Sequence, residues 1–529
     1  MKVSNIFKYI FIIFAIAIII YAGYRIYNTN TDNNQIEESK VIEEQEIVKD
    51  IRIAVTNYDS MNPLITNNKE ILNIDTLIFE PLFTLTQNYE LRPCLAKECS
   101  KTGDNTYVVK LNNNILWQDD TEFTAYDIQY TINTIKAGNS VYKYNVEYIE
   151  NVEVIDKNTI KLTLVGNIPF FEYYLVFPIM PSAYYLNENF YETEKIPIGT
   201  GQFKISNISS SSITLVKNEL WRDIKENNSK IETITIKLYS SMGEAYNSFK
   251  IGNVDLLNTT NPNFQDYIGT IGFNKTEYAG REFDFLALNC ENTILKEKEV
   301  RQAISYAIDK DNIVSSIFSN QYLTAEYPLD YGNYLYEANE VSSGYNAQQA
   351  KKVLEENGWT YKSNRWRKNI DGTTQKLKIK ISVQKENNTR VQVAELIKEQ
   401  LEEIGIEVTI EKISQEQYDN YINNKNYQVL LTGVYTSYIP DLTYYFGRGN
   451  LENYANENMQ ELINSVSIIK DSAELKERYK KIYSIYKEDV PFIGLYRNKN
   501  ITITSQDLIG TIKPNTYTSF YDISLWYRK

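Results

Sequence analysis

The stretch LKIKISVQKENNTRVQVAELIKEQLEEIGIEVTIEKI, residues Leu377–Ile413, decides the fold class because it predicts a strand, a helix and a second strand in succession. Leu377–Val383 and Ile406–Ile413 are rich in apolar β-formers and are predicted to be strands. Between them, Arg390–Glu403 predicts a helix that ends before Gly405, a residue type common just after helices. This order indicates a parallel crossover, and therefore an α/β protein.

Similar patterns extend through the chain toward the N-terminus. Ile51–Val55 alternates like a first strand, and Thr106–Leu111 has the same character. Thr124 and Asp127 have the spacing of a capping box, so a helix is expected from there to about Lys136. Further strands are predicted at Val152–Ile155, Thr159–Val165, Ser212–Lys217 and Glu232–Leu238, and further helices at Val300–Ile308 and Ala347–Glu356.

The composition excludes several classes of function. The chain has 529 residues and no histidine, which removes Ser-His-Asp and Cys-His nucleophile pairs and paired-His zinc sites. With 55 Lys and Arg against 68 Asp and Glu, the net charge is −13, and no clustered basic face for nucleic acid is visible. Three cysteines give no disulfide framework. Acid–base chemistry by carboxylates, Lys or Tyr stays open.

The N-terminus predicts a membrane anchor. Lys2 and Lys8 precede an uncharged apolar run from Tyr9 to Tyr24. A cleaved signal is the alternative, but Ala22-Gly23 is the only small pair and bulky residues flank it. We therefore favour residues 1–28 as a cytoplasmic N-terminus with an uncleaved transmembrane helix, and a cell-membrane protein whose large domain lies outside the cytoplasm.

Residues 29–50 predict an acidic stem. They hold seven acidic and two basic residues and no aromatic residue. Such a segment repels itself and buries little, so it is expected to be a disordered spacer. A short solvated helix through its Glu-rich part is the alternative.

No catalytic, cofactor or metal constellation is visible in the sequence. Gly199-Thr200-Gly201 lacks the third glycine and the following helix of a phosphate-binding loop, and predicts a turn. Cys94 and Cys99 lack the partner ligands of a zinc site. We therefore expect a binding protein that is not an enzyme and needs no cofactor.

Four segments resemble blocks of the family 5 extracellular solute-binding proteins, the receptors of ABC importers for oligopeptides, dipeptides and nickel. The blocks occur in the family's order. They are Leu95-Ala96 with TYVVKLNNNILWQDDTEFTAYDIQYTI at Thr106–Ile132, IGTGQF at Ile198–Phe203, EVRQAISYAIDK at Glu299–Lys310, and Tyr345-Asn346 with Ala350–Leu354 and Gly358-Trp359.

The resemblance implies a bilobed periplasmic-binding-protein-like α/β fold, type II, of the large oligopeptide-binding subclass, with an inserted third domain. Lobe I would comprise residues 51–79, 181–282 and 497–529. The inserted domain II would comprise 80–180, and lobe II 283–496. Ligand would bind between two lobes that close on it. Arg301 is expected to order the second lobe by pairing locally, and a role at the hinge is the alternative.

The resemblance also indicates ligand-binding residues. In oligopeptide receptors, an Asp after a strand of the second lobe pairs with the free amine of the peptide. The similar segment here is Gly433–Asp441, and a gapless alignment places Ser437 at that position. Serine has no charge for an ammonium group, and Asp441 would compensate only if the loop shifted. The expected cleft residues are Tyr435, Ser437, Tyr438 and Asp441, then Thr56, Asn57, Met61 and Asn62 after the first strand, then Tyr173 and Tyr174.

Two functions are consistent with these patterns. The first is a monomeric, membrane-tethered receptor that captures a peptide or similar small solute and delivers it to an ABC permease with its ATPase. The alternative is a receptor-like sensor or assembly protein that has lost transport. The missing histidine disfavours a nickel receptor, because no imidazole is available to hold a metal complex.

Overall fold

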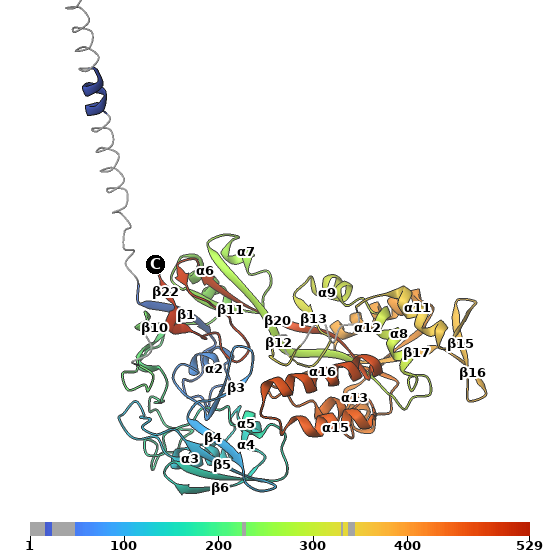
Figure 1. Ribbon diagram of the computed structural model, residues 1–529, viewed down its shortest axis with the longest axis horizontal. Helices are drawn as coiled ribbons and strands as arrows, with labels where there is room; N and C mark the ends of the chain where they lie inside the picture. The colour runs from blue at the N-terminus through green and yellow to red at the C-terminus, as the bar shows by residue number, and fades with distance from the viewer. Residues whose placement is uncertain (1–15, 24–47, 225–228, 330–331, 337–343) are drawn as a thin grey trace, which may run out of the picture. The chain divides into compact units, whose positions relative to one another are not determined.

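The computed structural model describes residues 16–23, 48–224, 229–329, 332–336 and 344–529 (Figure 1). Lys49–Tyr527 forms one compact unit, while Met1–Val48 and Arg528–Lys529 form a second. Residues 16–23 are helical. In the described part of the chain, no helix is both long and apolar enough to cross a membrane. Most of the predicted anchor and of the predicted stem lies outside the described residues.

The main element of Lys49–Tyr527 is a mixed eleven-stranded sheet. Its strands, in spatial order, are β18 (Glu407–Ile413), β17 (Lys378–Gln384), β19 (Val429–Tyr435), β12 (Phe273–Leu288), β20 (Phe492–Ser505), β11 (Leu256–Thr259), β1 (Asp50–Thr56), β10 (Thr233–Tyr239), β9 (Ser212–Lys217) and β8 (Phe203–Ile208), with β13 (Tyr322–Thr324) paired to β20.

Two long antiparallel strands, β12 and β20, connect the two parts of this sheet. They have 16 and 14 residues, and in the order of the sheet they lie between β19 on one side and β11 on the other. Figure 1 shows them between β11 and β17. Their pairing is interrupted between Ala279 and Phe283, where Asn498 of β20 faces a bulge formed by residues 280–282. Bulges of this kind bend a strand and redirect its side chains.

The predicted strand–helix–strand unit is confirmed. β17 and β18 pair in parallel, and α12 (Asn388–Glu403) connects them. Asn387 caps this helix by accepting a hydrogen bond from the amide of Arg390. Its buried residues recur at helical spacing, so one face of the helix covers the sheet; they include Val393, Ala394, Ile397 and Leu401.

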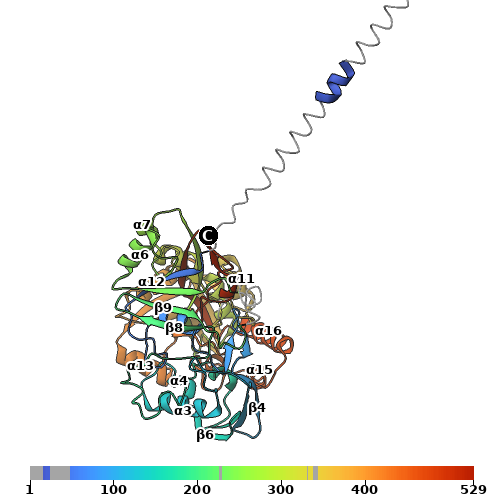
Figure 2. The same ribbon diagram turned by 90° about the vertical axis from the view of Figure 1, so that its left-hand side faces the viewer.

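A smaller four-stranded antiparallel sheet comes from the chain between residues 96 and 164. Its order is β4 (Ala96–Lys101), β5 (Thr106–Leu111), β7 (Thr159–Leu164) and β6 (Ile149–Asp156). Figure 2 shows it beside α3 (Ala125–Ala137) and α4 (Lys143–Val146). The predicted capping box is confirmed, because the Asp127 carboxylate accepts a hydrogen bond from the Thr124 amide at 2.8 Å.

The remaining elements are short strands and covering helices. The strands are β2 (Phe83–Leu85), β3 (Leu91–Pro93), β14 (Thr360–Lys362), β15 (Arg365–Ile370), β16 (Thr373–Lys376), β21 (Leu508–Ile509) and β22 (Tyr527–Arg528). The helices are α2 (Lys69–Asp75), α5 (Phe171–Tyr174), α6 (Met242–Lys250), α7 (Gln265–Ile268), α8 (Lys298–Ala307), α9 (Lys310–Phe318), α11 (Ala347–Glu356), α13 (Gln415–Asn424), α14 (Thr443–Phe446), α15 (Glu457–Val466), α16 (Ser472–Asp489) and the 3-10 helix η1 (Ile523–Leu525).

Two of the segments that carried the family resemblance have a structural role. Arg301 of α8 is buried and donates hydrogen bonds to the backbone carbonyls of Leu295 and Asp489, which confirms its expected local pairing. Gly199 lies directly against the backbone carbonyl of Ile78. The predicted division into lobes and an inserted domain remains a prediction, and its lobe boundaries at 282 and 496 lie within β12 and β20.

Candidate ligand-binding site

A cavity of about 760 Å³ within Lys49–Tyr527 is the candidate site. Its volume falls in the range of small-molecule pockets. Segments far apart in sequence form its walls: α2, the residues around α4, the segment after α5, the β12 bulge, the end of β19 with the following loop, and the turn near residue 516. Its charged side chains are Lys69, Glu70, Asp75 and Arg281.

Arg281 lies between two tyrosines on one wall of this cavity. Its guanidinium carbon is 4.5 Å from the ring centre of Tyr435 and 4.0 Å from that of Tyr438. Its Nε donates a hydrogen bond to the Thr436 carbonyl at 2.6 Å. Guanidinium–aromatic stacking fixes the plane of the group and leaves its edge for polar contacts.

The backbone of the β12 bulge explains the position of Arg281. Asn498 accepts a hydrogen bond from the amide of Glu282 at 3.0 Å, and a Cβ at Gly280 would lie 2.1 Å from the Asn498 side-chain oxygen. Only glycine therefore allows this close approach. The bulge releases Arg281 from regular pairing with β20, beside the end of β19.

Helix α2 contributes two carboxyl groups. Glu70 accepts a hydrogen bond from the Thr56 amide at 2.7 Å, and burial nevertheless raises the pKa of Glu70 to about 7. Asp75 is 3% exposed, and neither of its side-chain oxygens has a hydrogen-bond partner among the described residues. Burial raises the pKa of Asp75 well above its usual value, and the nearby charge of Asp59 adds to this.

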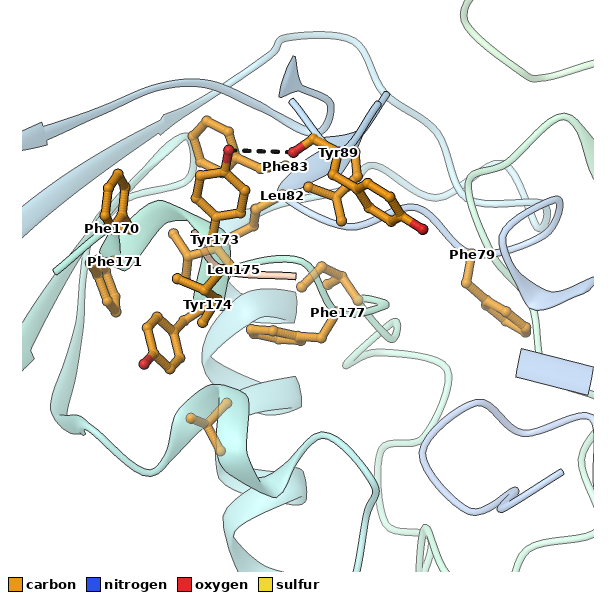
Figure 3. Close-up of a cluster of buried hydrophobic side chains, with 14 of the residues drawn as sticks. Phe79, Leu82, Phe83, Tyr89, Phe170, Phe171, Tyr173, Tyr174, Leu175 and Phe177 are labelled. Atoms are coloured by element: carbon orange, nitrogen blue, oxygen red, sulfur yellow. Dashed lines mark hydrogen bonds between the residues drawn. The ribbon is translucent and has the colours of Figure 1, made fainter. Parts of the chain in front are cut away.

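Tyrosines line much of the remaining surface. Tyr438 donates a hydrogen bond to the Thr516 carbonyl at 2.5 Å and lies edge-on to Tyr517. Tyr173 donates to the Tyr89 carbonyl at 3.4 Å and packs among apolar side chains that include Phe177 (Figure 3). Such rings offer apolar area together with a polar group, which suits ligands with a backbone and varied side chains.

The structure brings together only some of the predicted site residues. Tyr435, Ser437, Tyr438 and Tyr173 line the cavity. Tyr174 is absent from the lining, although its hydroxyl lies 3.1 Å from that of Tyr144, which does line it.

The other predicted residues lie outside this lining. Met61 is buried in the core, and Asn62 uses its side chain to accept a hydrogen bond from the Leu64 amide. Asn57 is an exposed turn residue with φ of 52°. Asp441 lies two residues before the short helix α14 begins, and it accepts a hydrogen bond from the Thr443 amide at 2.9 Å.

Sequence reasoning did not find Arg281 or Asp75. Arg281 belongs to a strand, and only the pairing of β12 with β20 reveals its bulge. Asp75 ends a short helix, where an acidic residue is normally solvated. Its sequence signal was an acid within an otherwise apolar face of α2, beside Ile71 and Ile74.

The arrangement suits reversible binding. In the described part of the chain, no cluster of three or more Cys, Asp or Glu side chains is placed to hold a metal ion. The cavity instead offers a stacked guanidinium, two carboxyl groups, a lysine and several hydroxyls around apolar walls.

The sequence of residues 90–455 matches the family model of the bacterial extracellular solute-binding proteins, family 5 (Middle). The chain belongs to this family. The match covers more than half of the chain and includes the cavity-lining residues from α4 to the loop after β19.

Full-length relatives agree with this assignment. The oligopeptide-binding protein AppA of Bacillus subtilis is 24% identical over 505 residues, covering 88% of this chain and 89% of AppA. The glutathione-binding protein GsiB of Escherichia coli is 23% identical over 520 residues, covering 90% and 94%. The solved structure of HbpA2 from Haemophilus parasuis shares the fold with a TM-score of 0.73 at 20% identity, covering 91% of this chain and all of HbpA2.

Proposed function

We propose that this family member captures a peptide or a similar small solute in the cavity and delivers it to an ABC permease. The observation that carries the proposal is a cavity of about 760 Å³ with charges of both signs and many tyrosines, lined by segments distributed along almost the whole compact unit. A peptide has charged ends, amide groups and varied side chains, and such walls match each of these. The names of AppA and GsiB, which bind an oligopeptide and glutathione, support this ligand class.

In the proposed mechanism, two lobes close on the ligand. Residues 51–79, 181–282 and 497–529 form lobe I, 80–180 the inserted domain and 283–496 lobe II. The long strands β12 and β20 pass from one lobe to the other and serve as the hinge. Because α2 belongs to lobe I and the Tyr435–Ile439 segment to lobe II, a ligand that contacts both would favour the closed state.

Location outside the cytoplasm completes the proposal. The apolar run Tyr9–Tyr24 anchors the chain in the cell membrane, and the acidic segment between it and Lys49 gives the binding unit reach toward a permease. The basic N-terminal residues Lys2 and Lys8 favour this orientation.

Native mass spectrometry of the purified full-length chain tests capture. We expect added mass from co-purified solute, or from a random tripeptide pool, that is displaced by excess competing peptide. A spectrum of unliganded protein only, at every concentration of the pool, would contradict peptide capture.

A further inference from the structure

Among the described residues that line the cavity, only Asp75 has a charged group that is fully buried and has no hydrogen-bond partner. It ends α2 with 3% of its surface exposed. Burying a carboxyl group without a hydrogen bond or a counter-charge is unfavourable, so the fold holds this group at a cost. A partner that arrives with the ligand would remove that cost.

The surroundings of Asp75 supply no such partner. No Lys or Arg of the described residues forms an ion pair with it. The groups that interact with it electrostatically are Asp59 and the hydroxyls of Tyr58 and Tyr142. Tyr142, Tyr438 and Arg281 line the same cavity as Asp75, and the ring of Tyr438 stacks on the Arg281 guanidinium.

Arg281 is the complementary group. No Asp or Glu of the described residues forms an ion pair with it. Some other arginines of the fold do have an acidic partner, as Arg52 has in Asp255 and Arg390 has in Asp284. Its Nε donates a hydrogen bond to the Thr436 carbonyl, and its guanidinium plane stacks on the rings of Tyr435 and Tyr438. A held guanidinium edge of this kind binds a carboxylate with two parallel hydrogen bonds.

We propose that Asp75 receives the ammonium group of the ligand and Arg281 its carboxylate, so that the cavity selects zwitterionic ligands such as short peptides with both ends free. The inference rests on the proposed capture of a peptide. Ser437 lines the cavity at the position where oligopeptide receptors have the Asp that pairs with the amine, and it carries no charge. In the proposed arrangement Asp75 supplies that charge instead. In this arrangement lobe I supplies the charge for the amine, from a helix that precedes the inserted domain.

The test uses random tripeptides in three forms: both ends free, N-acetylated, and C-terminally amidated. Titration calorimetry measures their binding to the full-length chain and to Asp75→Asn, a variant of nearly equal shape. We expect acetylation to weaken binding to wild type by at least about tenfold, and Asp75→Asn to weaken binding of the free form equally. Asp75→Asn should leave binding of the acetylated form unchanged, because an acetylated amine has no ammonium charge to pair with Asp75.

Three controls separate the possible causes. Asp266→Asn removes an exposed charge on α7 and should bind like wild type. Asp75→Asn should unfold at or above the wild-type temperature, since it removes an unpartnered carboxyl group, so a loss of binding is not a loss of fold. Arg281→Gln should abolish the preference for the free acid over the amide.

The outcomes distinguish this inference from the proposed function. If no form binds wild type, peptide capture fails and the inference fails with it. If free and acetylated pools bind equally well, or if Asp75→Asn keeps the preference for the free amine, peptide capture stands and only the assignment of Asp75 is overturned. Loss of that preference in Asp441→Asn instead would place the amine at the loop after β19.

Discussion

Glu70 shows how a single buried residue connects the cavity to solution conditions. Its folded-state pKa is about 7 against an ordinary value of 4.5, and burial is the main cause. Between these two pH values the folded protein holds a proton that the unfolded chain releases. The contribution of Glu70 to the free energy of unfolding therefore falls as pH rises through this window and levels off above about pH 7.

Glu70→Gln should remove the part of the fall in the free energy of unfolding with rising pH that Glu70 causes. The raised pKa corresponds to a destabilisation of up to about 3 kcal/mol at pH 8, because each pKa unit is worth about 1.4 kcal/mol. Urea unfolding between pH 5 and pH 8 measures the slope. The variant should keep the part that Glu452 contributes, since the pKa of this buried carboxyl is raised to about 8. An unchanged slope between pH 5 and 7 would contradict the buried, protonated state of Glu70.

The candidate site could be predicted residue by residue only where a family motif or a local pattern indicates it. The family resemblance indicated the Tyr435–Tyr438 segment, and the structure places Tyr435, Ser437 and Tyr438 at the cavity. Asn57 and Met61 follow a strand that the sequence pattern predicts, yet Met61 is buried in the core. Arg281 and Asp75 depend on a bulge and on packing between distant segments, and neither is encoded in local periodicity.

At the scale of elements, close backbone contact constrains the turn at Gly199. A Cβ at this position would lie 1.9 Å from the Ile78 carbonyl oxygen, and backbone cannot move aside as a flexible side chain can. Gly199→Ala should therefore lower the free energy of unfolding by about 3 kcal/mol, at the upper end of overpacking costs. Chemical denaturation measures the loss.

Gly166→Ala is the matched control for this substitution. Nothing lies within 4 Å of a Cβ added at Gly166, so a change within about 0.5 kcal/mol is expected. Equal effects of the two substitutions would show that the contact between Gly199 and Ile78 is not a constraint.

A largely buried ion pair links β12 to α12. Arg390 donates to both oxygens of Asp284 at 2.7 and 2.8 Å, and Tyr496 donates to the same carboxylate at 2.8 Å. Asp284→Asn leaves the arginine charge buried without its partner, so we expect a loss of about 3 kcal/mol or more in urea unfolding.

The surface pair of Lys298 and Glu488 is the reference for this loss. Glu488→Gln should cost at most about 1 kcal/mol, because exposed pairs are screened by solvent. If Asp284→Asn were no more costly than Glu488→Gln, the buried pair would not hold α12 on the sheet.

Most elements of the fold could be predicted because each carries its own signal. The alternation in Leu377–Val383, the helical face of Arg390–Glu403 and the capping box at Thr124 all act within a few residues. The order of strands in the eleven-stranded sheet could not be predicted, since β1 pairs with β10 more than 170 residues later. The length of β12 and β20 could not be predicted because polar residues interrupt the apolar pattern of both strands. They are exposed or partly buried in β12 and partly buried at residues 498–500 in β20.

In the whole molecule, the proposed ligand site is built from segments that lie far apart in the sequence. Segments around residues 70, 142, 281, 438 and 516 share a single cavity, and a bound peptide would contact several of them at once. Ligand that binds only the folded state also stabilises it, by an amount that grows with the ratio of its concentration to its Kd.

Hydrogen–deuterium exchange tests whether these segments form one ligand site. It is measured on the full-length chain with and without the random tripeptide pool. We predict slower exchange on ligand addition in residues 67–79, 278–282, 435–439 and 515–517 together, with little change in β14, β15 and β16. Protection confined to one of these segments, or located only elsewhere, would contradict a ligand site shared by these segments.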